Sequence, residues 1–415
     1  MRLAGSTVIA TALLLATTPV LAQVPVPEST PIASSYFDDL AWLWLVEQLV
    51  LLGLPCCLLF SGWAAAIETR LERLSANRWP ITAAGFAGLY ALLYSIVRLP
   101  VDYTRVVQLN PYFPAPTPIL SSWLSEQIMP IVQLIVIATA LGTIAIWLVR
   151  KSRNWWWAWA AGAISIFYIG SLMLQPVTAA QSHVPIDSSQ YAGWQDRLDG
   201  LALRANVTDT PVFIWQTTEQ DFCRIQNSVV GLGPTRRLVL ADQIFAEWDS
   251  GQIDVAFAHE LKHYLLDNTW VPVVLVLILS FSGALFVFAI GTLTCRRWGV
   301  RLRFSSLAQP AALPLLVALV QIYLLVAVPA FNLTAQRVEL EADRFALELT
   351  RNNDARARVS ADQCGRLWLP EDTLFARLYL NTHPSVAKRI QLANDYRPWE
   401  TGDEGAYGDL ITSVD

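Results

Sequence analysis

The chain has 415 residues, of which 54% are hydrophobic and only 15% are charged. An average soluble domain carries about 25% charged residues, so this composition argues against a soluble protein and for a membrane protein. The net charge is −5 and the basic residues stand in short clusters, which argues against nucleic acid as a partner.

The first segment, residues 1–23, has the layout of a signal peptide. Arg2 precedes a mostly apolar run from Val8 to Leu15, and Val20-Leu21-Ala22 precede Gln23. An uncleaved signal anchor has the same layout, so both alternatives stay open, and both place residues 24–40 outside the cytoplasm.

Six later stretches are apolar enough to span a bilayer, which requires about 20 apolar residues. Four of them form a predicted membrane bundle over 40–177, and the other two occupy 270–332. The stretches are 47–67, 79–97, 127–149, 155–177, 270–294 and 311–332. The chain is therefore expected to cross the bilayer six times, or seven times if the leader is retained.

The distribution of basic residues predicts which side each loop occupies. Short loops rich in Lys and Arg stay in the cytoplasm, and loops 68–78, 150–154 and 295–304 are of this kind, whereas 24–46 has no basic residue. Segments 178–269 and 333–415 should then share the exoplasmic side. Glu47 is either a functional carboxylate inside the first span or an interfacial residue at its start.

The first exoplasmic segment, 178–269, has an α+β pattern. A helix is expected over 188–206. Strands are expected over 211–215, 227–230 and 237–240, with a Gly-rich turn between the last two. Asp249 and Gln252 have the spacing of a capping box, which predicts a helix over about 250–267.

That predicted helix contains His259-Glu260-Leu261-Lys262-His263. Residues four apart lie on one helical face, so both imidazoles can reach a single zinc ion. Glu260 projects beside them, where a carboxylate can accept a proton from the attacking water. The spacing therefore predicts a catalytic zinc site.

A catalytic zinc ion needs a third protein ligand. Glu339 and Asp343 are again four apart, so Glu339 could bind the metal while Asp343 orients a histidine ring. Glu341 lies on another face and is expected to be a solvated charge. The alternative is a simple charged helix following a membrane span.

Two features of the exoplasmic segments remain: a pair of cysteines, and the tail 399–415 that follows the second peptidase half, 333–398. Cys223 and Cys364 are the two cysteines on the exoplasmic side, where they could form a disulfide or stay as free thiols. The tail after Arg397 has five acidic residues and no basic one, and is expected to be a loose end.

A set of motifs stands in an order found in one known family: Asn227–Gly233, Arg237–Asp242, His259–His263, Asn332, Glu339–Ala346, and Thr382–Ser385 followed by Arg389. With these motifs the chain resembles the type I CAAX prenyl endopeptidases and their bacterial relatives. These are membrane zinc metallopeptidases of the gluzincin type, with an HExxH and an ExxxD motif. The resemblance is specific over about 210–395 and only architectural over the first 180 residues.

The resemblance implies a mainly α, polytopic membrane helical bundle with an α+β zincin-like catalytic domain that two spans divide. It also implies roles for individual residues. His259, His263 and Glu339 would bind one Zn²⁺, with Glu260 as general base. His383 would stabilise the oxyanion, and Arg389 would support Asp343. The strand with Asn227, Val229 and Gly231 would bind substrate. Taken alone, a histidine before proline, such as His383, is more often a cap or a surface residue.

The chain departs from the family at Lys262, where a glycine is usual, and in the predicted exoplasmic position of its site. The CAAX specificity is therefore not carried over. The sequence predicts a zinc-dependent endopeptidase acting on membrane or exoplasmic proteins or peptides. Its expected location is the bacterial inner membrane, with a periplasmic catalytic domain. The alternatives are a signalling receptor with a peptidase site and a membrane scaffold with an idle zinc site.

Overall fold

The computed structural model describes residues 23–112, 117–179, 182–208, 210–217, 227–265, 270–362, 369–403 and 405–412. Within these ranges, six helices are long and apolar enough to cross a membrane, which confirms the predicted number of spans. They are α1 (Pro31–Phe60), α3 (Trp79–Leu109), α4 (Leu120–Lys151), α5 (Trp156–Thr178), α9 (Trp270–Leu302) and α10 (Leu313–Thr350). The leader up to residue 22, Cys223 and Cys364 lie outside the described residues.

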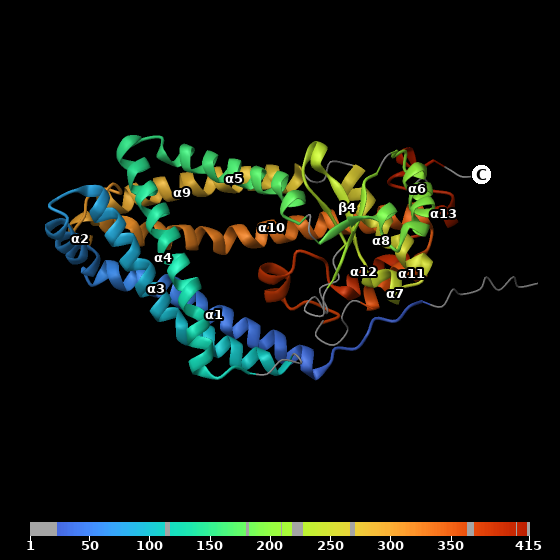
Figure 1. Cartoon of the computed structure of the whole chain (residues 1–415), viewed down its shortest axis with the longest axis horizontal. Helices are drawn as coiled ribbons and strands as arrows, with labels where there is room; N and C mark the ends of the chain where they lie inside the picture. The colour runs from blue at the N-terminus through green and yellow to red at the C-terminus, as the bar shows by residue number, and fades with distance from the viewer. Residues whose placement is uncertain are drawn as a thin grey trace, which may run out of the picture.

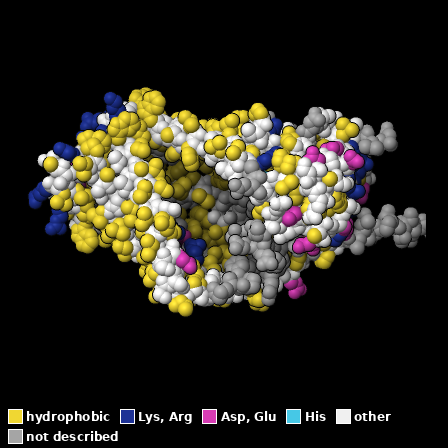
Figure 2. All heavy atoms as spheres, viewed as in Figure 1, with side chains coloured by type: hydrophobic (Ala, Val, Ile, Leu, Met, Phe, Trp, Pro, Cys, Tyr) yellow, Lys and Arg dark blue, Asp and Glu magenta, His cyan; other side chains and the backbone are white. Residues whose placement is uncertain are grey.

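The spans form one end of an elongated molecule, and the domain with the β-sheet forms the other (Figure 1). Helix α10, which has 38 residues, runs from the first region into the second. Hydrophobic side chains cover much of the bundle surface, and Lys and Arg side chains gather at the end far from the sheet (Figure 2). The multi-pass membrane architecture predicted from composition is therefore confirmed.

The predicted boundaries of the first span, 47–67, are wrong. Helix α1 begins at Pro31, where the Thr30 side chain accepts a hydrogen bond from the amide of Ala33 at 3.1 Å. Proline is favoured at the first helical position, so this start has a local cause. At the other end Gly62 adopts a left-handed φ of 79°, and a separate helix α2 (Trp63–Leu74) follows. Hydropathy identifies the apolar centre of a helix, whereas caps of this kind set its ends.

Glu47 lies inside α1 and is paired with two arginines of α3. Its carboxylate is 3.2 Å from Arg98 and 2.8 Å from Arg105. Arg98 also bonds Asp102 at 2.9 Å. These pairs offset the cost of placing a charge within a membrane span, so α1 and α3 are joined by an ionic contact.

Among the described residues, the sheet has four strands in the order β1-β2-β4-β3. They are β1 (His183–Pro185), β2 (Val212–Trp215), β3 (Ser228–Val230) and β4 (Arg237–Ala241). Strands β2 and β4 pair in parallel, and the other two pairs are antiparallel. The three strands expected from the sequence are confirmed, and β1, which has only three residues, was not predicted. Strand β3 is the last in this order and so lies at an edge of the described sheet.

The helix predicted over 188–206 is shorter than expected. Helix α6 covers Gln195–Arg204, and 3₁₀ turns at Ile186–Ser188 and Ala192–Trp194 precede it. The Ser189 hydroxyl accepts from the amide of Tyr191 at 3.1 Å, a local bond that competes with helix formation. The Tyr191 ring stacks on Phe245 at 4.5 Å, so the apolar face that suggested a helix is buried by turns instead.

The remaining helices pack around the sheet and α10. They are α7 (Gln243–Glu247), α8 (Ser250–Leu265), α11 (Asn353–Asp362), a π-helical segment (Ala376–Leu380), α12 (Val386–Asp395) and α13 (Pro398–Thr401). Leu198, Leu240, Phe257 and Phe345 belong to one buried cluster that joins α6, β4, α8 and α10.

The C-terminal tail is not loose over 405–412. Its amides at Ala406 and Tyr407 donate to the Glu348 carboxylate at 2.9 and 2.8 Å. Tyr407, Leu410 and Ile411 pack against the central apolar cluster. The expectation from charge was wrong because these three apolar side chains, rather than the acidic residues, determine where the segment lies.

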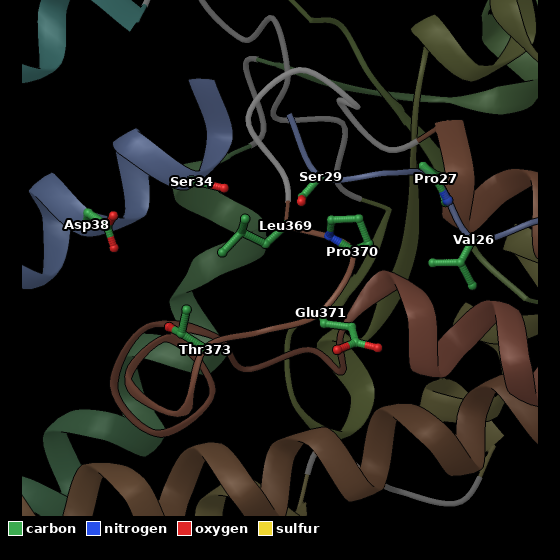
Figure 3. A pocket seen from close by; sticks show the side chains of 9 residues that line it. All are labelled: Val26, Pro27, Ser29, Ser34, Asp38, Leu369, Pro370, Glu371 and Thr373. Atoms are coloured by element: carbon green, nitrogen blue, oxygen red, sulfur yellow. The ribbon is translucent and has the colours of Figure 1, made fainter. Parts of the chain in front are cut away.

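The segment before α1 lies against the sheet-containing domain. The Val24 carbonyl accepts from the Asn394 side chain of α12 at 3.0 Å, and the Val24 side chain packs against a buried cluster to which α10, α11 and α12 contribute. A pocket of about 350 Å³ lies between this part of the chain and the segment 369–373, which precedes the π-helix (Figure 3). Its lining includes residues from 26–38 on one side and from 369–373 on the other. The first span is thus connected to this domain by an extended and partly packed segment.

Candidate metal centre

Helix α8 carries the two histidines of the HExxH motif, and its start is fixed by the predicted capping box. The Gln252 amide donates to Asp249 Oδ1 at 2.9 Å, and the Asp249 amide donates to Gln252 Oε1 at 3.2 Å. Phe257 and Leu261 are fully buried against the core. The helix is therefore held at its first turn and along its length.

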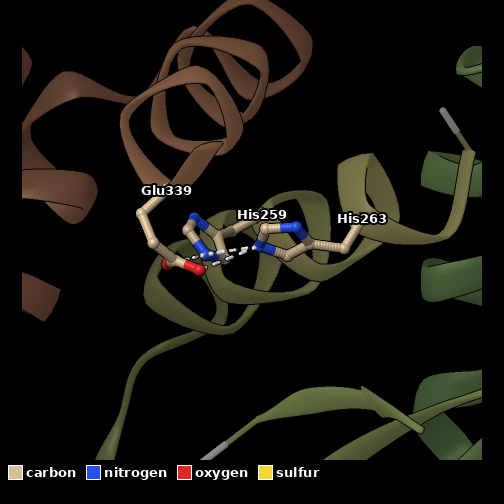
Figure 4. A group of neighbouring side chains, drawn as sticks. All are labelled: His259, His263 and Glu339. Atoms are coloured by element: carbon tan, nitrogen blue, oxygen red, sulfur yellow. Dashed lines mark hydrogen bonds and ion pairs between the residues drawn. The ribbon is translucent and has the colours of Figure 1, made fainter. Parts of the chain in front are cut away.

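The structure brings His259, His263 and Glu339 together (Figure 4). His259 Nε2 lies 3.2 Å from Glu339 Oε2 and 3.3 Å from His263 Nε2, and His263 Nε2 lies 3.5 Å from Glu339 Oε1. Zinc binds nitrogen and oxygen ligands at about 2.0–2.2 Å, so tetrahedral ligands are spaced by about 3.4 Å. The observed spacings fit that value, and two imidazoles with one carboxylate are a donor set that zinc accepts.

Asp343 lies behind His259 and is fully buried. Its Oδ1 is 2.8 Å from His259 Nδ1, which fixes the ring and leaves Nε2 directed at His263 and Glu339, the other two candidate ligands. Arg389 of α12 donates from Nε and Nη2 to the two oxygens of Asp343, both at 2.8 Å. The expected contacts of Asp343 and Arg389 are both present.

Arg356 of α11 also binds Asp343, a contact that the sequence reasoning missed. Its Nε and Nη2 are 3.1 and 2.6 Å from Asp343 Oδ1, and its Nη1 is 2.9 Å from Ser360 Oγ. The side chain is only 1% exposed. No local pattern marks this arginine, because its partner belongs to another helix.

Protonation in the site follows from burial and neighbouring charges. Burial lowers the pKa of His259, but its hydrogen bonds to Asp343 and Glu339 outweigh burial and raise it to about 9. Burial and the charge of His259 lower the pKa of His263 to about 4. An imidazole must be neutral to bind a metal ion, so binding at His259 would require the loss of the proton that Asp343 and Glu339 favour, whereas His263 is already neutral near pH 7.

Glu260 and His383 lie next to the three candidate ligands. Glu260 is 7% exposed. Burial raises its pKa to about 7, a value suited to a general base. His383 Nε2 lies 3.3 Å from Glu339 Oε2, so the histidine from the His-Pro motif reaches the same site. Lys262, the departure from the family pattern, is buried with Nζ 5.3 Å from the Tyr407 ring centroid.

The candidate substrate strand β3 has one neighbour, β4, among the described strands. Val229 of β3 pairs with Leu238 of β4. The Asn227 side chain accepts from the Ala241 amide at 3.0 Å and so holds β3 to β4. Gly231 has a φ of 90°, and a Cβ there would lie 2.4 Å from the Thr235 carbonyl oxygen. The backbone at position 231, next to the edge strand β3, therefore requires glycine for conformational and steric reasons, independently of any substrate.

Family models match nearly the whole chain. A model described as the N-terminal part of CAAX prenyl proteases, with five membrane helices, matches residues 16–180. The model of peptidase family M48 matches residues 191–397. Together with the helical bundle and the His-His-Glu cluster, these matches define a membrane metallopeptidase.

The chain belongs to peptidase family M48. It is 23% identical over 342 residues to the uncharacterized metalloprotease YhfN of Bacillus subtilis, covering 81% of this chain and 78% of that protein. Its fold is similar to the crystal structure of Ste24p from S. mikatae. That match has a TM-score of 0.64 and 17% identity, and covers 88% of this chain and 87% of the other. The family and the fold predicted from the sequence are confirmed.

Proposed function

We propose that the protein is a zinc-dependent endopeptidase that hydrolyses peptide bonds of membrane or exoplasmic proteins and peptides. The observation that carries the proposal is the spacing of 3.2–3.5 Å among ligand atoms of His259, His263 and Glu339, with Glu260 beside them on α8. His259, His263 and Glu339 would hold one zinc ion. When bound, zinc would supply Lewis-acid polarisation and make water more acidic.

The protein's own residues would carry the proton transfers. Glu260 accepts a proton from the attacking water and later returns it to the leaving amine, for which a pKa near 7 is suited. His383 donates a hydrogen bond to the substrate oxygen as negative charge develops in the transition state. Asp343, held by Arg356 and Arg389, keeps the His259 ring in place during the reaction.

An extended peptide would bind by adding a strand to the edge of β3. Main-chain hydrogen bonds of this kind give affinity with modest sequence preference, and they need the free groups of an edge strand. Val229 and Gly231 would face the peptide through their backbone, while Asn227 would keep β3 in register with β4.

The proposed location is the bacterial inner membrane, with the peptidase halves 178–269 and 333–398 on the periplasmic side. The support is charge: the basic side chains gather at the end of the bundle far from the sheet (Figure 2), and short basic loops remain in the cytoplasm. Reporter fusions after α2 and after α12 would test this orientation.

The function is tested with purified protein in detergent and a generic unfolded protein substrate. Glu260→Gln should bind about one zinc per chain, as the wild type does, but should lose turnover by a factor of about 10³ or more. Glu341→Gln, a half-exposed glutamate on α10, serves as the matched control and should keep wild-type turnover. Retained turnover in Glu260→Gln refutes the mechanism. Zinc without turnover in the wild type would favour a scaffold with an idle site.

A further inference from the structure

One face of α10 carries four polar side chains in succession: Asn332, Gln336, Glu339 and Asp343. Their spacing places them on the same side of the helix. Glu339 belongs to the candidate metal centre, and Asp343 orients His259. Asn332 and Gln336 are also buried, at 5% and 7% exposure, and their carboxamides donate to backbone carbonyls.

The two carboxamides bind the segment that leads to His383. Gln336 Nε2 donates to the carbonyls of Arg377 and Asn381, both at 2.8 Å. Asn332 Nδ2 donates to the carbonyl of Leu378 at 2.9 Å. These carbonyls lie in or just after the π-helix Ala376–Leu380. The last carbonyls of a helix have no partner within it, so α10 satisfies them instead.

His383 lies between two attachments to the same helix. On one side, Asn381 is held by Gln336. On the other side, Ser385 caps α12, and Arg389 of that helix is bound to Asp343. Glu339 lies between Gln336 and Asp343 on α10, and His383 Nε2 is 3.3 Å from its Oε2. The metal ligand and both attachments of the His383 segment therefore share one rigid element.

We propose that Gln336 is a positioning residue for His383: its carboxamide fixes the end of the π-helical segment so that the imidazole faces the substrate oxygen. The inference rests on the proposed function, in which His383 stabilises the transition state. Both amide hydrogens of Gln336 are used, so a carboxylate at this position would face two carbonyl oxygens and repel them. Asn332 supports the same segment one turn earlier.

The test is a double-mutant cycle in the full-length protein. His383→Ala should lower kcat by about 10²–10³, the usual loss for one oxyanion donor. Gln336→Leu should lower kcat by about 10-fold or more with KM changed less than about three-fold, and Gln336→Glu should lower it further. In the His383→Ala background, Gln336→Leu should cost less than about three-fold. Zinc content and the unfolding temperature establish that the variants are folded.

Gln321→Leu is the matched control, because this glutamine also lies on α10 but donates to Gln48 of α1. It should leave kcat unchanged. Equal losses from Gln336→Leu in both backgrounds, or an unchanged kcat, would overturn the proposal.

A second measurement does not depend on turnover. Hydrogen exchange of the amides over 377–385 should become faster in Gln336→Leu, while protection of α8 stays the same. Unchanged exchange there overturns the inference even if no substrate is cleaved. An inactive wild type with the expected exchange result would instead count against the proposed function alone.

Discussion

Replacing Arg356 tests whether the buried arginine cluster stabilises the domain around the metal centre. Arg356→Met keeps an unbranched side chain of similar length but removes two charge-assisted hydrogen bonds to Asp343 and one to Ser360. Breaking a buried ion pair from one side costs about 3–5 kcal/mol. Because Asp343 keeps both bonds from Arg389, we expect the lower end, about 3 kcal/mol.

The assay is thermal unfolding in detergent, followed by tryptophan fluorescence at one fixed scan rate. For a large domain, 1 kcal/mol corresponds to about 2 °C, so the unfolding temperature should fall by about 6 °C. Unfolding of membrane proteins can be irreversible, which makes an equal scan rate essential for the comparison.

Arg358→Met is the control, because Arg358 lies on the same helix and is likewise ion-paired, with Asp249 and Asp354. Its side chain is 39% exposed, so its pairs are screened by water and should contribute no more than about 1 kcal/mol. If both variants lower the unfolding temperature equally, the reasoning from burial is refuted.

Two further outcomes follow from the structure. Removing zinc with a chelator should abolish turnover and lower the unfolding temperature, because a ligand present at about 1,000 times its Kd stabilises the folded state by about 4 kcal/mol. Added zinc should restore both the turnover and the unfolding temperature. An unfolding temperature that the chelator does not change would argue against a bound ion. Glu68 of α2 is buried, and burial raises its pKa to about 7. A carboxyl group whose pKa is raised in the folded state contributes stability that is fully present below pH 4.5 and is lost as the pH rises to about 7. Glu68→Gln should therefore become the more stable protein across that window, by at most about 3 kcal/mol at pH 8. A constant difference between the two proteins from pH 5 to 8 would contradict this assignment.

The sequence was most informative where a local spacing has a direct physical meaning. His259 and His263 are four residues apart and meet because an α-helix places such residues on one face. The capping box at Asp249 and Gln252 formed for the same kind of local reason. The number of spans could be predicted because a membrane helix needs a long apolar stretch.

Contacts between distant parts of the chain could not be predicted. Arg356 and Arg358 lie two residues apart on one helix, yet the first is 1% exposed and the second has a half-exposed side chain. Nothing in the local sequence distinguishes them, because the difference is made by Asp343 on α10. The packed tail around Tyr407 and the role of Gln336 depend on tertiary contacts in the same way.

The continuity of α10 sets a distance between the metal centre and the lipid. From Leu313 to Glu339 the helix rises about 39 Å at 1.5 Å per residue, whereas the hydrocarbon core is about 30 Å thick. If α10 stands upright with its first residue at one surface of the core, Glu339 lies about 9 Å beyond the opposite surface. An extended chain covers that distance with about three residues. In that arrangement, the proposed peptidase would cut a substrate anchored by its own membrane helix only a few residues from the point where the substrate leaves the bilayer.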